Sequence, residues 1–162
     1  EMCIRDRNVS MYKPGASREE IMEALRQARC EDILEKLPNG VDSVIGARGV
    51  YLSGGEMQRI ALARAILKDA PIVLLDEATA FADAENEYLI QRALDILLHG
   101  KTVLMIAHRL QTIVHADQII VMQRGGIAEQ GTHEELMQRQ GVYAKMYHEY
   151  ENSVSWKIGG LA

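Results

Sequence analysis

The sequence predicts an α/β domain built on a parallel sheet, and three consecutive segments carry this prediction. The apolar run 72–75 ends in Asp76-Glu77, as expected of a buried strand that delivers carboxylates to the edge of a sheet. Residues 83–98 then place apolar side chains at the spacing of a buried helix face. A second apolar run, 103–106, follows at once. A strand, a helix and a strand in this order are typical of parallel α/β architecture.

Composition narrows the class of protein. The chain has 162 residues, enough for one domain with a sizeable core, and its 48% hydrophobic and 25% charged residues are ordinary for a globular protein. The net charge of −5 gives no basic footprint, so nucleic acid is not expected as a direct partner. Cys3 and Cys30 are too few for a disulfide framework or a zinc site. No apolar run approaches the about 18 residues of a membrane span.

Helices are expected ahead of the first of these strands. Ser17 and Glu20 form a capping box in front of apolar residues at helical spacing, namely Ile21, Ala24, Leu25 and Ala28. A shorter helix over residues 33–37 should end at Pro38-Asn39-Gly40. The first third of the chain is therefore predicted to be mainly helical.

A smaller group of elements is expected after the second strand. The pattern predicts a short helix over 110–114 and a hairpin that pairs 119–122 with 127–129 around Arg124-Gly125-Gly126. Thr132 and Glu135 form another capping box. A last helix over 142–150 should end the domain, followed by a tail at 151–162.

The most informative segment is the start of a helix at Ser53. Its hydroxyl can cap the helix, and Glu56 three residues on completes a capping box. Gly54 and Gly55 remove side chains from the first turn, so backbone N–H groups and the positive end of the helix dipole can approach a phosphate. The sequence thus contains a helix start that can bind an anion, followed along the chain by the carboxylates of Asp76 and Glu77.

These segments together resemble the ATP-binding cassette (ABC) family, in its exporter-type members. Four motifs occur in the family's order: the signature motif at 52–56, Walker B at 72–77, the D-loop at 80–83 and the switch region at 106–110. The resemblance implies a P-loop NTPase fold, truncated at its N-terminus to the helical signature subdomain and the C-terminal part of the parallel-sheet core. It implies a partial nucleotide-binding domain at 8–150, with the helical part mainly at 8–70 and the core at 71–150. Residues 1–7 do not match and are interpreted as a foreign junction.

The resemblance also implies a role for each site residue. Ser53, Gly54, Gly55 and Glu56 would bind the ATP of an opposite subunit, together with Asp83 of the D-loop. Asp76 would hold Mg²⁺ through water, Glu77 would be the general base, and His108 would sense the γ-phosphate.

Each role has a structural alternative. Without a metal, Asp76 would be an unpaired carboxylate at a sheet edge, which costs free energy. Glu77 could instead be an acid that balances a helix dipole. His108 could be a histidine at a strand end whose hydrogen bonds are met within the protein. Glu56 stands where the family has glutamine. It could repel the nucleotide or cap its own helix, and capping is the favoured interpretation.

Further features depart from the family. The sequence contains no Gly-x-x-x-x-Gly-Lys-Ser/Thr loop, because Gly100-Lys101-Thr102 has Asp95 where the first glycine is required and follows a helix instead of opening one. Gly100 is interpreted as a helix end and Lys101 as a cation beside it. Ala47 replaces the usual glutamate of the exporter X-loop, which puts the coupling contact in question. Phe81 in the D-loop resembles members of the family linked to siderophore and multidrug handling.

The expected function is therefore ATP binding and hydrolysis that powers an exporter-type transporter, with ATP and Mg²⁺ as cofactors. Its partners would be a second nucleotide-binding domain and a transmembrane domain fused upstream, at the cytoplasmic face of the cell membrane. The isolated chain is expected to be inactive without its phosphate loop. The alternative is a soluble ABC ATPase that acts on DNA or ribosomes, although the sequence shows neither a heptad segment nor a basic surface.

Overall fold

The computed structural model describes residues 2–4, 8–46, 49–76, 84–107 and 110–159. The chain divides into two compact units, residues 1–105 and 106–162. The expected division at 70/71 falls inside the first unit, so the predicted subdomains stay a prediction.

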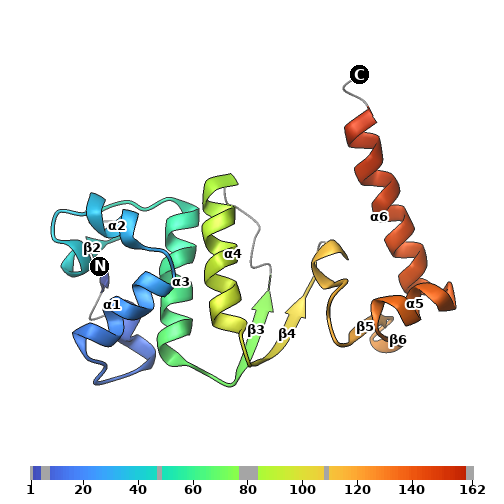
Figure 1. Cartoon of the computed structure of the whole chain (residues 1–162), viewed down its shortest axis with the longest axis horizontal. Coiled ribbons are helices and arrows are strands. Elements are labelled where there is room, and N and C mark those ends of the chain that lie inside the picture. Colours follow the sequence, from blue (N-terminus) through green and yellow to red (C-terminus); the bar gives the residue numbers. More distant parts are fainter. Residues whose placement is uncertain (1, 5–7, 47–48, 77–83, 108–109, 160–162) are drawn as a thin grey trace. The chain divides into compact units, whose positions relative to one another are not determined.

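The first unit is mainly helical, with two small two-stranded sheets, β1 paired with β2 and β3 paired with β4 (Figure 1). Its helices are α1 (Arg18–Gln27), α2 (Glu31–Lys36), α3 (Gly54–Lys68) and α4 (Ala84–Leu98), with the 3₁₀ turns η2 (Val9–Tyr12) and η3 (Gly40–Asp42). Its strands are β1 (Met2–Cys3), β2 (Val44–Ile45), β3 (Ile72–Asp76) and β4 (Thr102–Ile106), the last of which ends at the boundary between the units. The α/β class predicted from the sequence is confirmed.

The core of this unit lies between α1, α3 and α4. Helix α1 begins as predicted, since the hydroxyl of Ser17 accepts the amide of Glu20 and the Glu20 carboxylate accepts the amide of Ser17. The buried apolar residues recur at the spacing expected of one helix face. Side chains from all three helices form one apolar cluster: Ile21, Ala24, Leu25, Ile60, Leu62, Ala63, Leu67, Ile90, Ala93, Leu94 and Leu97. This packing fixes α3, whose first turn is the candidate site.

Strands β3 and β4 form a parallel pair, as predicted. The two arrows point the same way in Figure 1, and the amide of Thr102 donates to the carbonyl of Pro71 at the starting end of both strands. The expected burial of these strands is wrong. Val73 and Leu75 pack on the helical cluster, whereas Leu74 is 72% exposed on the other face and all of β4 is exposed. Within the described residues, helices cover only one face of this pair.

The second unit contains a hairpin and two helices, described here by themselves. Strand β5 (Ile119–Gln123) pairs antiparallel with β6 (Gly126–Gly131), with a bulge between Val121 and Met122. The predicted turn is confirmed, because Arg124 and Gly125 both have positive φ angles, 52° and 79°. The short turn expected at 110–114 is the 3₁₀ turn η4 (Leu110–Ile113).

Helix α5 (His133–Arg139) begins at the predicted capping box of Thr132 and Glu135. Helix α6 (Val142–Gly159) is longer than expected, since the sequence predicted an end at Tyr150 and a tail beyond it. The segment after Tyr150 contains no proline or glycine before Gly159, so nothing in it interrupts a helix.

Candidate functional site

The start of α3 has the geometry that its sequence predicts. Ser53 is the N-cap, with extended backbone angles of −64° and 164°. Its hydroxyl oxygen accepts the amide of Glu56 at 3.2 Å, and Oε2 of Glu56 accepts the amide of Ser53 at 2.8 Å. The capping role favoured for Glu56 is thus confirmed.

This cap leaves the first turn able to bind an anion. The amides of Glu56 and Met57 are taken by the hydroxyl and the carbonyl of Ser53. The amides of Gly54 and Gly55 have no carbonyl acceptor one turn earlier within the helix, as at every helix start. The Ser53 hydroxyl is an acceptor in the cap, so its hydrogen remains to be donated. Two amides, one hydroxyl and the positive helix end can therefore converge on one phosphate oxygen group.

Gly55 also has a packing role that the sequence did not reveal. It is buried, and a Cβ atom at this position would lie 2.7 Å from both Cβ and Cγ of Asn86 in α4. The absence of a side chain thus lets α3 and α4 approach closely. Because the amides at a helix start point along its axis, this packing does not compete with anion binding.

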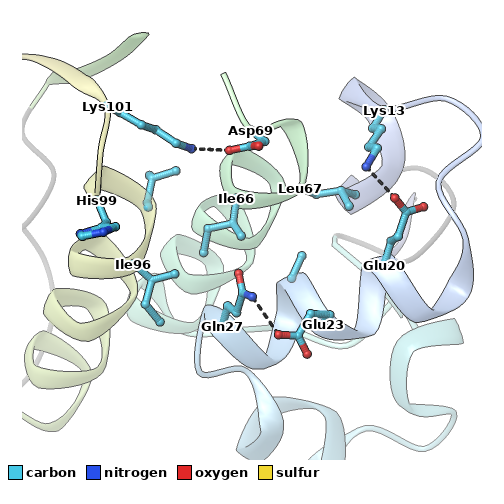
Figure 2. Close-up of a pocket in the computed structure, with 12 residues that line it drawn as sticks. Lys13, Glu20, Glu23, Gln27, Ile66, Leu67, Asp69, Ile96, His99 and Lys101 are labelled. Atoms are coloured by element: carbon cyan, nitrogen blue, oxygen red, sulfur yellow. Dashed lines mark hydrogen bonds and ion pairs between the residues drawn. The ribbon is translucent and has the colours of Figure 1, made fainter. Parts of the chain in front are cut away.

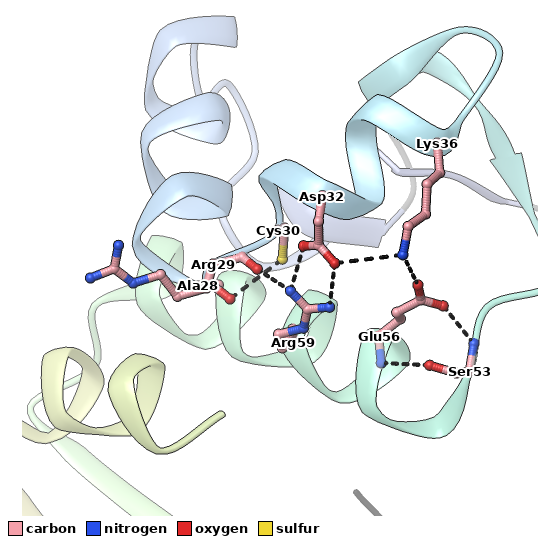
Figure 3. Close-up of polar contacts among 8 residues, drawn as sticks. All are labelled: Ala28, Arg29, Cys30, Asp32, Lys36, Ser53, Glu56 and Arg59. Carbon is pink, nitrogen blue, oxygen red and sulfur yellow. Dashed lines mark hydrogen bonds and ion pairs between the residues drawn. The ribbon is translucent and has the colours of Figure 1, made fainter. Parts of the chain in front are cut away.

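A chain of alternating charges connects α3 to α2 (Figure 3). Both guanidinium nitrogens of Arg59 donate to the carboxylate of Asp32, at 2.6 and 2.9 Å, and Arg59 also donates to the carbonyl of Arg29. Lys36 lies 3.8 Å from Asp32 and 3.4 Å from Oε1 of Glu56. The two helices are therefore tied together directly behind the candidate site.

Arg59 is the most buried charged side chain of this network, and sequence reasoning missed its role. The residue is 1% exposed, while the Asp32 side chain is 43% exposed. Hydrogen bonds from Arg59 hold the pKa of the Asp32 carboxyl below its usual value. The signal in the sequence was the position of Arg59 four residues after Gly55 on the buried face of α3.

Asp76 ends β3 as predicted, but it is exposed. An unpaired carboxylate at this position is therefore not costly, in contrast to what the sequence predicted, because water reaches it. In Figure 1 the strands β3 and β4 run opposite to α3 and α4, and Asp76 is the last residue of β3. An exposed carboxylate offers the oxygen ligands that magnesium prefers, so the residue still fits that ion.

The other predicted catalytic residues lie outside the described residues. The catalytic candidates are Glu77 and His108. The predicted nucleotide-binding residue Asp83 and the departures at Ala47 and Phe81 also lie outside the described residues. Their roles stay predictions.

A hollow of about 390 Å³ lies among η2, α1, α3 and α4 (Figure 2). Its charged side chains satisfy one another: Lys13 pairs with Glu20 at 2.6 Å, and Lys101 with Asp69 at 2.9 Å. Gly100 has a φ of 70° after the end of α4, as expected of a helix terminus. The structural interpretation of Gly100-Lys101-Thr102 is thus confirmed, since Lys101 binds the residue that ends α3.

A parallel α/β unit with an anion-binding helix start is the architecture of a nucleotide-binding domain of the P-loop NTPase class. The ABC transporter family model matches residues 4–80, and the chain belongs to this family. The sequence predicted that the resemblance begins at Asn8, whereas the family model matches from residue 4. The interpretation of residues 1–7 as a foreign junction stays a prediction.

Known proteins resemble nearly the whole chain. It is 53% identical over 86% of its length to the ATP-dependent lipid A-core flippase of Legionella pneumophila (strain Lens). It is equally identical, over the same share, to the mycobactin import ATP-binding/permease protein IrtA of Mycolicibacterium smegmatis. A solved structure of a bacterial Atm1-family ABC exporter with ATP bound covers 88% of the chain with a TM-score of 0.75 and 42% identity. None of these relatives supports the DNA or ribosome alternative.

The chain spans 24% of the flippase, 16% of the import protein and 25% of the exporter chain. Over the described ranges, no helix combines the length and the apolar character needed to cross a membrane.

Proposed function

We propose that this chain is the C-terminal part of the ATP-hydrolysing domain of an exporter-type ABC transporter. The names of the relatives support ATP-driven transport, and the structural neighbour is an exporter with ATP bound. In this proposal, two nucleotide-binding domains pair head to tail, and their closure around ATP drives a transmembrane domain. The domain would then act at the cytoplasmic face of the cell membrane, held there by the transmembrane part.

The capped start of α3 is the observation that carries this proposal. Ser53, Gly54 and Gly55 would bind the γ-phosphate of ATP held by the opposite subunit, through one hydroxyl and two amides. Such donors are arranged before the ligand arrives, so no reorganisation is needed when charge develops on the phosphate. Asp83 would contribute from the D-loop. Glu56 would support the site by capping.

The remaining residues would serve the ATP held by the chain's own subunit. Asp76 would hold Mg²⁺ through water, and the ion would neutralise charge on the phosphates. Glu77 would accept a proton from the attacking water, and His108 would hydrogen-bond the γ-phosphate. The order of these motifs along the chain supports the assignment.

The chain offers a matched pair of serines for testing the phosphate site. Ser17 and Ser53 cap α1 and α3 with the same hydrogen bonds to a glutamate three residues on. Replacing either by alanine should cost about 1 kcal/mol of stability through loss of the cap. In the full-length exporter, only Ser53→Ala should also weaken ATP-dependent closure and turnover. Equal effects of Ser17→Ala and Ser53→Ala on turnover would contradict the proposal.

The base is tested separately in the same protein. Glu77→Gln should lower turnover by a factor of about 10²–10⁴ while ATP-bound closed dimers accumulate, because only the proton acceptor is lost. Crosslinking across the dimer measures the closed form. If the variant neither binds ATP nor closes, Glu77 has a structural role.

A further inference from the structure

Glu56 presents an electrostatic problem for the proposed site. It places a carboxylate in the first turn of α3, where the γ-phosphate is proposed to bind, and two negative charges in one helix turn repel each other. Both oxygens of the carboxylate are engaged, however. Oε2 accepts the amide of Ser53 at 2.8 Å, and Oε1 receives the ammonium of Lys36 at 3.4 Å. The Glu56 side chain is 16% exposed and that of Lys36 is 67% exposed, so water screens the carboxylate less than the ammonium.

The compensating cation comes from another helix. Lys36 is the last residue of α2, and Figure 3 shows its side chain reaching down to Glu56. On the other side, Asp32 is already matched by the two hydrogen bonds from Arg59. The four charges alternate in sign and sum to zero. Loss of Lys36 would therefore leave one net negative charge behind the start of α3.

We propose that Lys36 is a positioning residue of the ATP site: its ammonium neutralises Glu56, so the start of α3 stays attractive to the γ-phosphate of the opposite subunit although a glutamate stands in its first turn. The inference rests on the proposed function of Ser53, Gly54 and Gly55. It adds a residue of α2 to that site and explains how the site accommodates Glu56.

The same chain contains an arrangement that separates this effect from structure. At the start of α1, Glu20 caps Ser17 through Oε2 and receives Lys13 on Oε1 at 2.6 Å. As with Lys36, Glu56 and Ser53, a lysine pairs with the glutamate of a capping box, and the ion pair at α1 is the shorter of the two. The α1 start has no proposed role in binding ATP. Lys13→Gln is therefore the matched control for Lys36→Gln.

The experiment measures KM for ATP, kcat and melting temperature in the full-length exporter. Lys36→Gln should raise KM about fivefold to tenfold, the size expected when one unit charge near a phosphate is left uncompensated, with kcat changed less than twofold. Lys36→Arg should restore KM, and Lys13→Gln should leave it unchanged. In the Glu56→Gln background, Lys36→Gln should change KM less than twofold, because the charge that Lys36 neutralises is gone.

Two results would overturn the inference. One is an unchanged KM in Lys36→Gln, and the other is an equal rise in KM in both backgrounds, which would show that Lys36 only holds α2 in place. Ser53→Ala distinguishes failure of the underlying function. If Ser53→Ala impairs turnover while Lys36→Gln leaves KM unchanged, only the role of Lys36 is wrong. If Ser53→Ala has no more effect than Ser17→Ala, the α3 site itself is wrong.

Discussion

The pair of Arg59 and Asp32 predicts an asymmetric loss of stability. Asp32→Ala leaves the guanidinium of Arg59, 1% exposed, without its carboxylate. Arg59→Met instead leaves a carboxylate that is 43% exposed and can be hydrated, while the methionine keeps much of the apolar stem. Losing the partner of a buried charge should cost more than losing the partner of a charge that water can reach.

The burial of the two side chains sets the magnitude. Breaking a fully buried pair costs about 3–5 kcal/mol, and an exposed pair is worth about 0–1 kcal/mol. Because one partner is buried and the other half open, we expect about 2–3 kcal/mol for Asp32→Ala and about 1 kcal/mol for Arg59→Met. The exposed pair of Arg26 and Glu23, 2.7 Å apart, supplies the control, and Glu23→Ala should change stability by less than about 1 kcal/mol.

Urea unfolding followed by circular dichroism measures these free energies, with the slope compared among variants to confirm a common transition. The reasoning is refuted if Arg59→Met costs as much as Asp32→Ala, or if Asp32→Ala costs no more than Glu23→Ala. The first result would mean that the buried guanidinium gains no more from the pair than the half-exposed carboxylate does. The second would mean that the guanidinium reaches water when its partner is removed.

Three further outcomes are expected. Hydrogen bonds from Arg59 lower the pKa of Asp32 in the folded protein. The stability that this pair contributes should therefore be complete above the unfolded-state pKa of about 3.9, and it should be lost as the pH falls through the lower folded-state pKa. Unfolding measured as a function of pH should show this loss in the wild type and not in Arg59→Met. Gly55→Ala should lower the free energy of unfolding by about 1–3 kcal/mol even without nucleotide, because its methyl group would meet Asn86; a loss seen only in ATP binding would show that packing is not involved. The purified 162-residue chain should release no phosphate from ATP, since its sequence contains no phosphate loop, and magnesium-dependent turnover abolished by Glu77→Gln would contradict this.

The parts of the fold that depend on neighbouring residues could be predicted from the sequence. The capping boxes at Ser17, Ser53 and Thr132 involve groups three residues apart, and all three occur as expected. The turn at Arg124-Gly125 is equally local, since the glycine at 125 adopts its positive φ of 79° without steric cost. The helix start at the candidate site was therefore predictable together with its hydrogen bonds.

The parts that depend on distant residues could not be predicted. An apolar run such as β3 indicates a strand, but what covers each face comes from elsewhere, so Leu74 was expected to be buried and is exposed. The pairing of Arg59 joins residues 27 positions apart, and no spacing rule connects them. The contact of Gly55 with Asn86 likewise depends on how two helices pack.

The parallel pair β3 and β4 has a consequence for handling the chain as a separate polypeptide. Large apolar side chains, including Leu74 and Leu104, face water along strands whose outer backbone groups can pair with another chain. Such an exposed apolar surface on unpaired strands is a template for self-association. Solubility, more than folding of the helices, should therefore limit the concentration at which the isolated chain can be studied.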